Sequence, residues 1–297
     1  MKFKRRKYEK EQVLWGWLLI APTFIGLLVL NIIPAFQTFI LSFQKSGGFG
    51  QKAWAGLENY QRLISDTEVL QAVGNTLIYT AISVPFIIVL SMFSAVLMNQ
   101  KIKGISVYRT LFFLPVVATP AAVAMIWRWL FNSDYGIINH LLLKVGIVGP
   151  NWLTNPKTAI VAIAIVGIWS TVGYNMVLLL SGLQEIPKDF YESAEIDGAS
   201  PFRQFFSITL PLVTPTLFFV LVTTVINSLQ VFDLIFMMID KTNAALPKTQ
   251  SLVYLFYKHS FIMNDKGYGS AIVMVLLLII MIVTAIQIKT QKKWVNY

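Results

Sequence analysis

The sequence contains no cysteine and few charged residues. Without cysteine, the chain forms no disulfide, no thiolate metal site and no catalytic thiol. Only 13% of its 297 residues are charged and 56% are hydrophobic, whereas an ordinary soluble domain is about a quarter charged. So few charges cannot cover the surface of a soluble fold of this size. We therefore expect membrane lipid to surround part of the chain.

Sequence patterns for nucleotide, metal or nucleophilic chemistry are also missing. There is no G-x-x-x-x-G-K-S/T loop, so the chain does not hold ATP phosphates in that way. G-x-S-x-G and H-E-x-x-H do not occur either. The two histidines, His140 and His259, lack the spacing of metal ligands, and we expect structural roles for both. We predict no enzyme site, no cofactor and no metal.

The net charge is +10, which raises the question of nucleic-acid binding. The Lys and Arg residues lie in short segments between apolar runs and not on one broad patch. That distribution is typical of charges that orient a protein in a membrane. Nucleic acid is therefore not an expected partner.

Long apolar runs dominate the sequence. A membrane-spanning helix needs about 20 largely apolar residues, and continuous apolar runs favour helices over a barrel of alternating strands. Six segments qualify, with the fifth long enough to be tilted, broken or partly outside the bilayer: 13–36, 73–98, 107–131, 159–183, 208–238 and 270–288. We predict an all-α integral membrane protein with six transmembrane helices.

Basic residues predict how these spans are oriented. They cluster most strongly before the first apolar run, at Lys2, Lys4, Arg5, Arg6, Lys7 and Lys10. Positive charge beside the first helix usually keeps that end in the cytoplasm. We predict a multi-pass protein of the cell membrane with both termini, the loop around residue 101 and the loop 185–206 in the cytoplasm. Residues 1–70 would hold the N-terminus, a retained first helix and an outer loop, 71–291 a core of five helices, and 292–297 a cytoplasmic tail.

The loop between the fourth and fifth spans predicts a short acidic helix. Pro187 suits the first position of a helix. Asp189, Glu192 and Glu195 place negative charge toward its N-terminal half, which the helix dipole favours. Gly198 tolerates the left-handed conformation and is a natural stop. We expect this helix to lie on the cytoplasmic membrane face, with its acids in water.

A second short helix is expected directly after the glycine. Ser200 can cap it and Pro201 can begin it. Its aromatic residues, Phe202, Phe205 and Phe206, are expected to pack into the bundle before the fifth span begins.

The order of residues in this loop closely resembles a known family motif. E-S-A-x-x-D-G-A, followed by F-x-x-I-x-L-P-x-x-x-P, is similar to the EAA loop of binding-protein-dependent ABC importer permeases. The resemblance is most specific for the carbohydrate-type group, which includes maltose and glycerol-3-phosphate importers. It covers nearly the whole chain, with further similar motifs at Gly173-Tyr174-Asn175, Leu183-Gln184-x-Ile186-Pro187, Asn75-Thr76, and Tyr108-Arg109 with Pro115.

The resemblance implies a set of partners and a role for the loop. In this family the loop is a coupling helix that docks on a separate ATPase subunit, where ATP is hydrolysed. It also implies a second permease subunit, two ATPase subunits and an extracytoplasmic solute-binding protein. Two departures are Ser193, where relatives often have alanine, and residues 240–247, where many have a glycine-rich loop. The coupling residues implied here are Glu192, Ser193, Ala194, Asp197 and Gly198.

Polar side chains recur on one face of two predicted spans. Thr224, Asn227 and Ser228 are spaced i, i+3 and i+4 and therefore share a helix face. Polar groups facing lipid are unfavourable, so both faces should look inward. Hydrogen bonding between helices would explain them as well, but relatives bind substrate between the matching helices, which favours a solute path. The predicted path residues are Ser170, Thr171, Tyr174, Asn175, Thr224, Asn227, Ser228 and Gln230.

Several alternatives stay open from sequence alone. Asp233 is the main acidic residue in a predicted span, and substrate contact or structural pairing would explain it equally well. An ion-coupled secondary transporter would usually have more spans or inverted repeats, and a membrane scaffold would not need the polar faces. Spans four and five have no basic residue in their middle, which favours a neutral sugar or polyol over glycerol-3-phosphate, although the second subunit could supply a cation.

Overall fold

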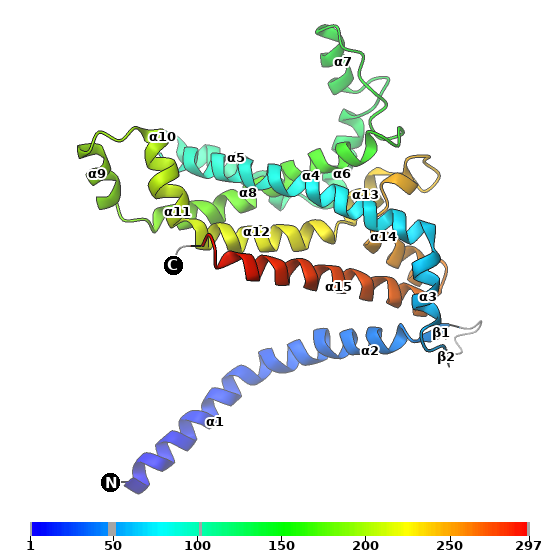
Figure 1. The fold of residues 1–297 in the computed structure, drawn as a ribbon, viewed down its shortest axis with the longest axis horizontal. Coiled ribbons are helices and arrows are strands. Elements are labelled where there is room, and N and C mark those ends of the chain that lie inside the picture. The colour runs from blue at the N-terminus through cyan, green and yellow to red at the C-terminus, as the bar shows by residue number, and fades with distance from the viewer. Residues whose placement is uncertain (1, 47–51, 101–102, 296–297) are drawn as a thin grey trace.

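The protein is almost entirely helical in the computed structural model, which describes residues 2–46, 52–100 and 103–295. Four long helices, α4 (Thr67–Met98), α8 (Ala159–Gln184), α12 (Thr214–Leu229) and α15 (Lys266–Gln291), run side by side and form a bundle (Figure 1). The short helices α9 (Asp189–Ile196) and α10 (Pro201–Gln204) lie at one end of this bundle (Figure 1). The two strands lie at the other end, with α3 (Glu58–Ser65) and α14 (Leu252–Tyr257) (Figure 1). We call these the α9 end and the α3 end.

The first predicted span is one long helical path. It consists of α1 (Lys2–Leu27), the π-helical turn η1 (Leu28–Ile32) and α2 (Ile33–Leu41). Proline at position 34 has no N–H to donate, and the helix before it widens into a π-helical turn. In this turn the N–H of Ile33 bonds to the carbonyl of Leu28, five residues earlier. α1 diverges from the bundle (Figure 1), and the apolar window within Glu11–Leu41 of this helical path has no buried residue. Only lipid or another subunit can cover such a surface.

A small β-hairpin follows at the α3 end. Its strands, β1 (Gln44–Ser46) and β2 (Lys52–Trp54), are antiparallel, with Lys45 opposite Ala53. The next helix, α3 (Glu58–Ser65), is amphipathic and buries Leu63 against the bundle.

Three predicted spans are continuous helices. They are α4 (Thr67–Met98), α8 (Ala159–Gln184) and α15 (Lys266–Gln291). The carboxylate of Asp66 caps α4 by accepting a hydrogen bond from the N–H of Glu68 at 2.9 Å. α8 is the most enclosed: 56% of its most apolar window is buried, against 44% for α4 and 17% for α15. α8 is therefore the central helix, while α15 keeps a broad face for lipid or partners.

The third predicted span is broken. α5 (Ile105–Val117) and α6 (Pro120–Leu130) meet at an angle of 100°. Pro120 disfavours a helical conformation at Thr119, whose backbone is extended (φ −66°, ψ 142°). The Thr119 hydroxyl instead caps α6 by accepting a hydrogen bond from the N–H of Ala122 at 3.4 Å. α7 (Ile137–Lys144) then projects from the side of the bundle (Figure 1).

The fifth predicted span is also interrupted. The lead-in formed by α10 (Pro201–Gln204), the π-helical turn η3 (Phe205–Thr209) and α11 (Leu210–Leu212) meets α12 (Thr214–Leu229) at 69°. The segment 208–238, which the sequence indicated could be tilted or broken, is therefore a broken span. Its last part is a separate helix, α13 (Asp233–Met238), beyond a non-helical break at 230–232. The remaining elements are α9 (Asp189–Ile196), η4 (Leu246–Lys248), α14 (Leu252–Tyr257) and η5 (Lys258–Ile262).

The all-α membrane fold is confirmed, but the number of spans depends on how the bent pairs are counted. Among the described residues, four helices are long and apolar enough to cross a membrane, and six are if each bent pair is one span. The core consists of apolar clusters along the bundle, and α8 contributes to three of them.

Candidate functional site

The acidic loop folds as a helix, a glycine turn and a second helix, as the sequence predicts. α9 begins at Asp189, two residues later than Pro187 suggested. Gly198 has a positive φ of 72°, and its N–H donates to the carbonyl of Glu195 at 3.0 Å. The next N–H, from Ala199, donates to the carbonyl of Ala194 at 2.8 Å. This pair of bonds closes the helix C-terminus and requires a left-handed residue in the middle.

The predicted coupling residues lie on the surface at the α9 end. Glu192, Ser193, Asp197 and Gly198 are exposed and Ala194 is half-buried. Sequence reasoning did not single out Ile196, an apolar side chain that is 87% exposed at the C-terminus of α9.

α9 is held against the lead-in to α12. The hydroxyls of Tyr191 and Thr209 are 3.0 Å apart, and the side chain of Gln204 donates to the carbonyl of Ala199 at 3.1 Å. Tyr191 and Phe205 also pack on the apolar cluster between α4, α8 and α12. A force on α9 would therefore reach α12 through packed side chains. The prediction that Phe202 and Phe206 pack into the bundle was wrong: their rings contact each other in a tilted arrangement, 4.7 Å between centroids, and the side chains are 74% and 50% exposed.

Two adjoining cavities lie between α4, α8 and the break after α12. The first, here the proline cavity, has a volume of about 330 Å³ and includes Pro115 and Pro120 in its wall. The second, here the amide cavity, has a volume of about 190 Å³ and includes Asn227 and Gln230. They share one wall, formed by Tyr79, Thr171, Asp233 and Leu234.

Nearly all the predicted path residues line these cavities. Ser170 and Tyr174 line the proline cavity, while Thr171 lines both. The residues on the α12 side line the amide cavity: Thr224, Asn227, Ser228 and Gln230. The exception is Asn175, which does not line either cavity. It donates a hydrogen bond to Thr224 at 2.8 Å inside the bundle.

Tyr79 on α4 belongs to the shared wall and was missed from sequence. Its ring fits because Gly167 on α8 has no side chain: a β carbon there would overlap the Tyr79 hydroxyl. In the sequence this contact appears only as a tyrosine and a glycine in two separate apolar runs, and nothing there indicates that the two residues meet.

The break between α12 and α13 leaves backbone groups without helical partners. The carbonyl of Val231 accepts a hydrogen bond from the buried hydroxyl of Ser251 at 2.5 Å. Because unpaired backbone groups are costly inside a membrane protein, this bond stabilises the break that brings Asp233 to the cavities.

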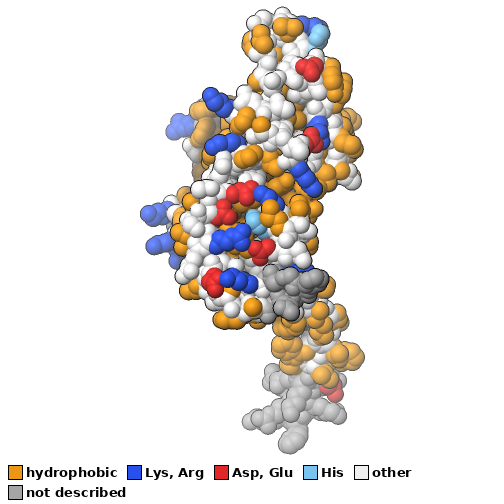
Figure 2. Space-filling model, turned by 90° about the vertical axis from the view of Figure 1, so that its right-hand side faces the viewer, with side chains coloured by type: hydrophobic (Ala, Val, Ile, Leu, Met, Phe, Trp, Pro, Cys, Tyr) orange, Lys and Arg blue, Asp and Glu red, His pale blue; other side chains and the backbone are white. Residues whose placement is uncertain are grey.

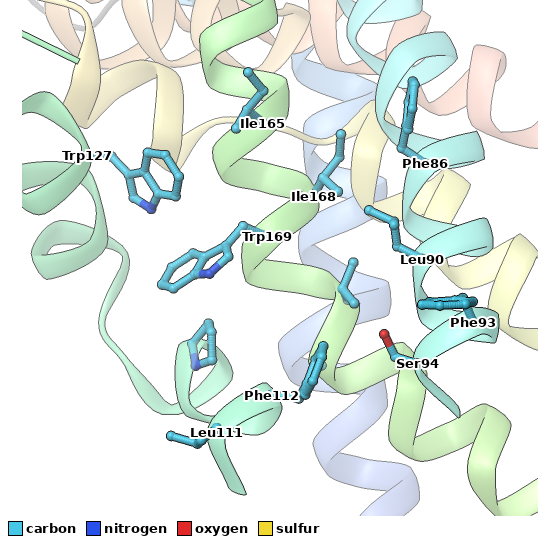
Figure 3. A pocket seen from close by; sticks show the side chains of 13 residues that line it. Phe86, Leu90, Phe93, Ser94, Leu111, Phe112, Trp127, Ile165, Ile168 and Trp169 are labelled. Atoms are coloured by element: carbon cyan, nitrogen blue, oxygen red, sulfur yellow. The ribbon is translucent and has the colours of Figure 1, made fainter. Parts of the chain in front are cut away.

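A larger groove lies beside the cavities and is nearly all apolar. It has a volume of about 690 Å³ and is lined by α4, α5, α6 and α8. Figure 3 shows Trp127 of α6 and Trp169 of α8 close together on one side, with Phe93 of α4 on the other. The two tryptophan rings pack edge to face at 5.6 Å. Among the described lining residues only Ser94 has a hydroxyl, so the groove suits apolar groups and not a polyhydroxylated solute.

The loop that departs from the family pattern is anchored to α4. The side-chain amide of Asn75 donates to the carbonyls of Pro247 and Gln250 at 2.9 and 3.1 Å. The hydroxyl of Thr76 accepts a hydrogen bond from the N–H of Leu252 at 3.2 Å. The Asn75-Thr76 motif therefore positions the segment between α13 and α14.

Charged side chains gather at the α3 end (Figure 2). Three contacts connect the elements there: Arg62 of α3 with Asp265 before α15 (3.0 Å), Lys258 of η5 with Glu68 of α4 (2.6 Å), and the Tyr268 hydroxyl of α15 with the Asp66 carboxylate before α4 (2.6 Å). Burial raises the pKa of Asp66, but the hydrogen bonds from Tyr268 and from backbone N–H groups outweigh it and lower the pKa below its ordinary value.

His259 is buried within this charged cluster. Its ring packs edge to face on Tyr268 at 4.9 Å, and within the described ranges its Nε2 has no hydrogen-bond partner. Burial, followed by the nearby charge of Arg62, lowers the pKa of His259 below its ordinary value. No three side chains of His, Asp or Glu in the described part of the chain lie close enough together to hold a metal ion.

Comparison with known proteins shows the family. Residues 67–293 match the family described as "Binding-protein-dependent transport system inner membrane component". The chain is 34% identical to the probable ABC transporter permease protein YesP of Bacillus subtilis, over 99% of this chain and 95% of that protein. It is also 34% identical to the trehalose/maltose transport system permease protein MalF of Thermococcus litoralis, over 95% of both chains. With the sn-glycerol-3-phosphate transport system permease protein UgpA of Pectobacterium atrosepticum it shares 32% identity, again over 95% of both.

A solved structure has the same fold. A chain from the crystal structure of a bacterial ABC transporter involved in the import of the acidic polysaccharide alginate superposes with a TM-score of 0.81, covering 96% of this chain and 98% of that one at 21% identity.

This protein belongs to the family of inner-membrane components of binding-protein-dependent transport systems. The resemblance to carbohydrate-type ABC importer permeases is thereby confirmed, and the relatives are membrane permeases, not enzymes. The comparisons give no support to an ion-coupled secondary transporter.

Proposed function

We propose that this chain forms half of the translocation path for a sugar or related polyol in an ATP-driven importer. It would pair with a second permease subunit, receive solute from an extracytoplasmic solute-binding protein and be driven by two ATPase subunits that hydrolyse the ATP. In this arrangement residues 71–291 are the permease core and both termini are cytoplasmic. The α9 end then faces the cytoplasm and the α3 end faces outside.

The placement of polar residues in the two cavities carries this proposal. Hydroxyl and amide groups that recognise sugars need a concave site in which they converge. Side chains from α8 and α12 converge in this way in the proline and amide cavities, beside a break in the α12–α13 segment. Broken helices at such sites are a recurrent feature of membrane transporters.

The coupling role rests on the exposed acidic face of α9. Glu192 and Asp197 are free to meet basic or donor groups of an ATPase subunit, and the turn at Gly198 returns the chain to α10. The contacts of Tyr191 and Gln204 would transmit movement of α9 to the α12 wall of the amide cavity.

A neutral sugar or polyol is the solute that the cavities favour. The names of the relatives include trehalose/maltose, lactose and sn-glycerol-3-phosphate. A phosphorylated solute would need a cation in its path, and no Lys or Arg is among the described residues that line either cavity.

Uptake by cells that carry the complete importer tests both roles. The probes are radiolabelled maltose, lactose, trehalose and sn-glycerol-3-phosphate. Asn227→Ala should raise the half-saturation concentration for the transported probe, whereas Thr223→Ala, on the same helix but outside both cavities, should not. Glu192→Lys should abolish uptake while the subunits still reach the membrane. Unchanged uptake in both Asn227→Ala and Glu192→Lys would contradict the proposal.

A further inference from the structure

Asp233 occupies an unusual place between the two cavities. It is the first residue of α13, directly after the break that ends α12, and its side chain is exposed. It lines both the proline cavity and the amide cavity, in the wall that they share with Tyr79 and Thr171. A solute that passes between the cavities must pass this carboxylate.

The carboxylate of Asp233 is not used to hold the fold together. Among the described residues, it takes part in no ion pair and no side-chain hydrogen bond that the structure shows. Arg128, the basic residue of α6 that contacts this region, is engaged at the opposite end of α13. There it bonds to the carboxylate of Asp240 at 2.8 Å and to the carbonyl of Met237 at 3.3 Å. Of the two explanations open from sequence, structural pairing is therefore the weaker one.

Asp233 is also the only residue with a formal charge among the described residues that line the two cavities. Every other polar group there is a hydroxyl, a phenol or an amide. In a cavity with partly apolar walls, the interaction with a second charge is several times stronger than in bulk water. One unpaired carboxylate is thus enough to give the cavities a negative potential.

We propose that Asp233 sets the charge preference of the path, an inference that rests on the proposed function. The carboxylate repels anionic solutes, such as phosphorylated sugars and uronates, and accepts hydrogen bonds from the hydroxyl groups of a neutral saccharide. Charge-assisted bonds of this kind are stronger than those between neutral groups. Asp233 therefore selects a neutral polyhydroxylated solute over an anion of similar size.

The absence of cysteine provides a direct test. Ser170→Cys and Asn227→Cys each place a single thiol, one in each cavity, and His140→Cys places one on α7, away from both. The assembled importer in membrane vesicles is treated with a cationic or an anionic methanethiosulfonate reagent, and the two modification rates are measured. Each reporter is combined with Asp233→Asn and, as a matched control, with Asp240→Asn, which removes a carboxylate outside the cavities.

The expected result is a preference for the cationic reagent of about 10-fold at both cavity thiols, relative to the thiol at position 140. Asp233→Asn should remove most of it and Asp240→Asn should keep it. If both thiols react but the preference is the same with Asp233→Asn, the inference about Asp233 is wrong and the proposed path stands. If neither thiol reacts with either reagent, the cavities do not conduct solutes, and the proposed path and this inference both fail.

Discussion

The side-chain amide of Asn175 on α8 donates a hydrogen bond to the hydroxyl of Thr224 on α12 across 2.8 Å, and both side chains are almost completely buried. This bond joins the two helices whose other polar residues line the cavities. Asn175 therefore fulfils the alternative role considered from sequence, hydrogen bonding between helices, while its partner Thr224 also lines the amide cavity. One polar helix face serves both purposes.

Replacing Thr224 by valine should destabilise the protein by about 1 kcal/mol, because the amide of Asn175 would stay buried without its acceptor. The loss should be smaller when Asn175 is replaced by leucine at the same time, since no buried polar group is then unpaired. Thermal unfolding of the purified protein in detergent measures both changes. Thr223→Val is the matched control, because the Thr223 hydroxyl bonds only to carbonyls of its own helix. Equal destabilisation by Thr223→Val and Thr224→Val would show that the interhelical bond is unimportant.

The contact between Tyr79 and Gly167 leads to a paired prediction. Gly167→Ala would place a methyl group where the Tyr79 hydroxyl lies, and overpacking of this kind costs about 1–3 kcal/mol. Tyr79→Phe removes the overlapping oxygen, so the double variant should regain most of the lost stability. Gly74→Ala is a suitable control, since a β carbon at that position meets nothing within 4 Å. The unfolding midpoints of the four proteins check this, and no recovery in the double variant would refute it.

The continuous helices could be predicted from sequence, whereas the positions of the breaks could not. A window of about 20 apolar residues is sufficient to predict α8 and α15, because the thickness of the membrane core sets the length of a spanning helix. Proline alone does not locate a break: Pro85 lies inside α4 without interrupting it, whereas Pro120 begins a new helix. The difference is the extended backbone of Thr119 and its hydroxyl cap, which depend on how α5 and α6 pack.

In the candidate site, too, local spacing could be predicted and contacts between distant segments could not. The spacing of Thr224, Asn227 and Ser228 placed them on one face, and that face lines the amide cavity. Tyr79 could not be predicted, because its role depends on a glycine on another helix. Asp233 was placed inside a long span by its apolar neighbours. The break at residues 230–232, stabilised by the distant Ser251, is a tertiary feature that local sequence does not encode.

Ile196 should contribute to docking of the ATPase, if α9 is the coupling element. Burying an exposed apolar side chain against a partner is favourable, and Ile196 is 87% exposed. Ile196→Asp should reduce co-purification of the ATPase with this chain by about 10-fold or more, without changing the thermal stability of the permease alone. Asp189→Asn, at the opposite end of α9, should leave co-purification unchanged. Normal co-purification with Ile196→Asp would exclude this surface from the interface.

His259 should make the stability of the charged cluster sensitive to acid. The groups around it are Arg62 and Lys258, which lower its pKa, and Glu68 and Asp265, which raise it, with Asp66 and Tyr268 also in the cluster. Because burial lowers the pKa in the folded protein below the ordinary value of 6.5, the unfolded chain binds more protons as the pH falls through about 6.5. The free energy of unfolding should therefore decrease as the pH falls from 7.5 to 5.5.

His259→Gln should make that decrease in the free energy of unfolding smaller, because the group that takes up the proton is gone. Each kcal/mol removed from the acid dependence corresponds to about 2–4 °C in the unfolding midpoint. Asp66 does not confuse the test, because its pKa is lowered from 3.8 and its contribution is lost only in stronger acid. His140→Gln is the control: it changes the other histidine, which is exposed on α7. Unfolding midpoints at pH 7.5 and 5.5, measured for all three proteins in the same detergent, check the prediction. If His259→Gln keeps the full acid dependence while His140→Gln removes it, the buried histidine is not the group responsible.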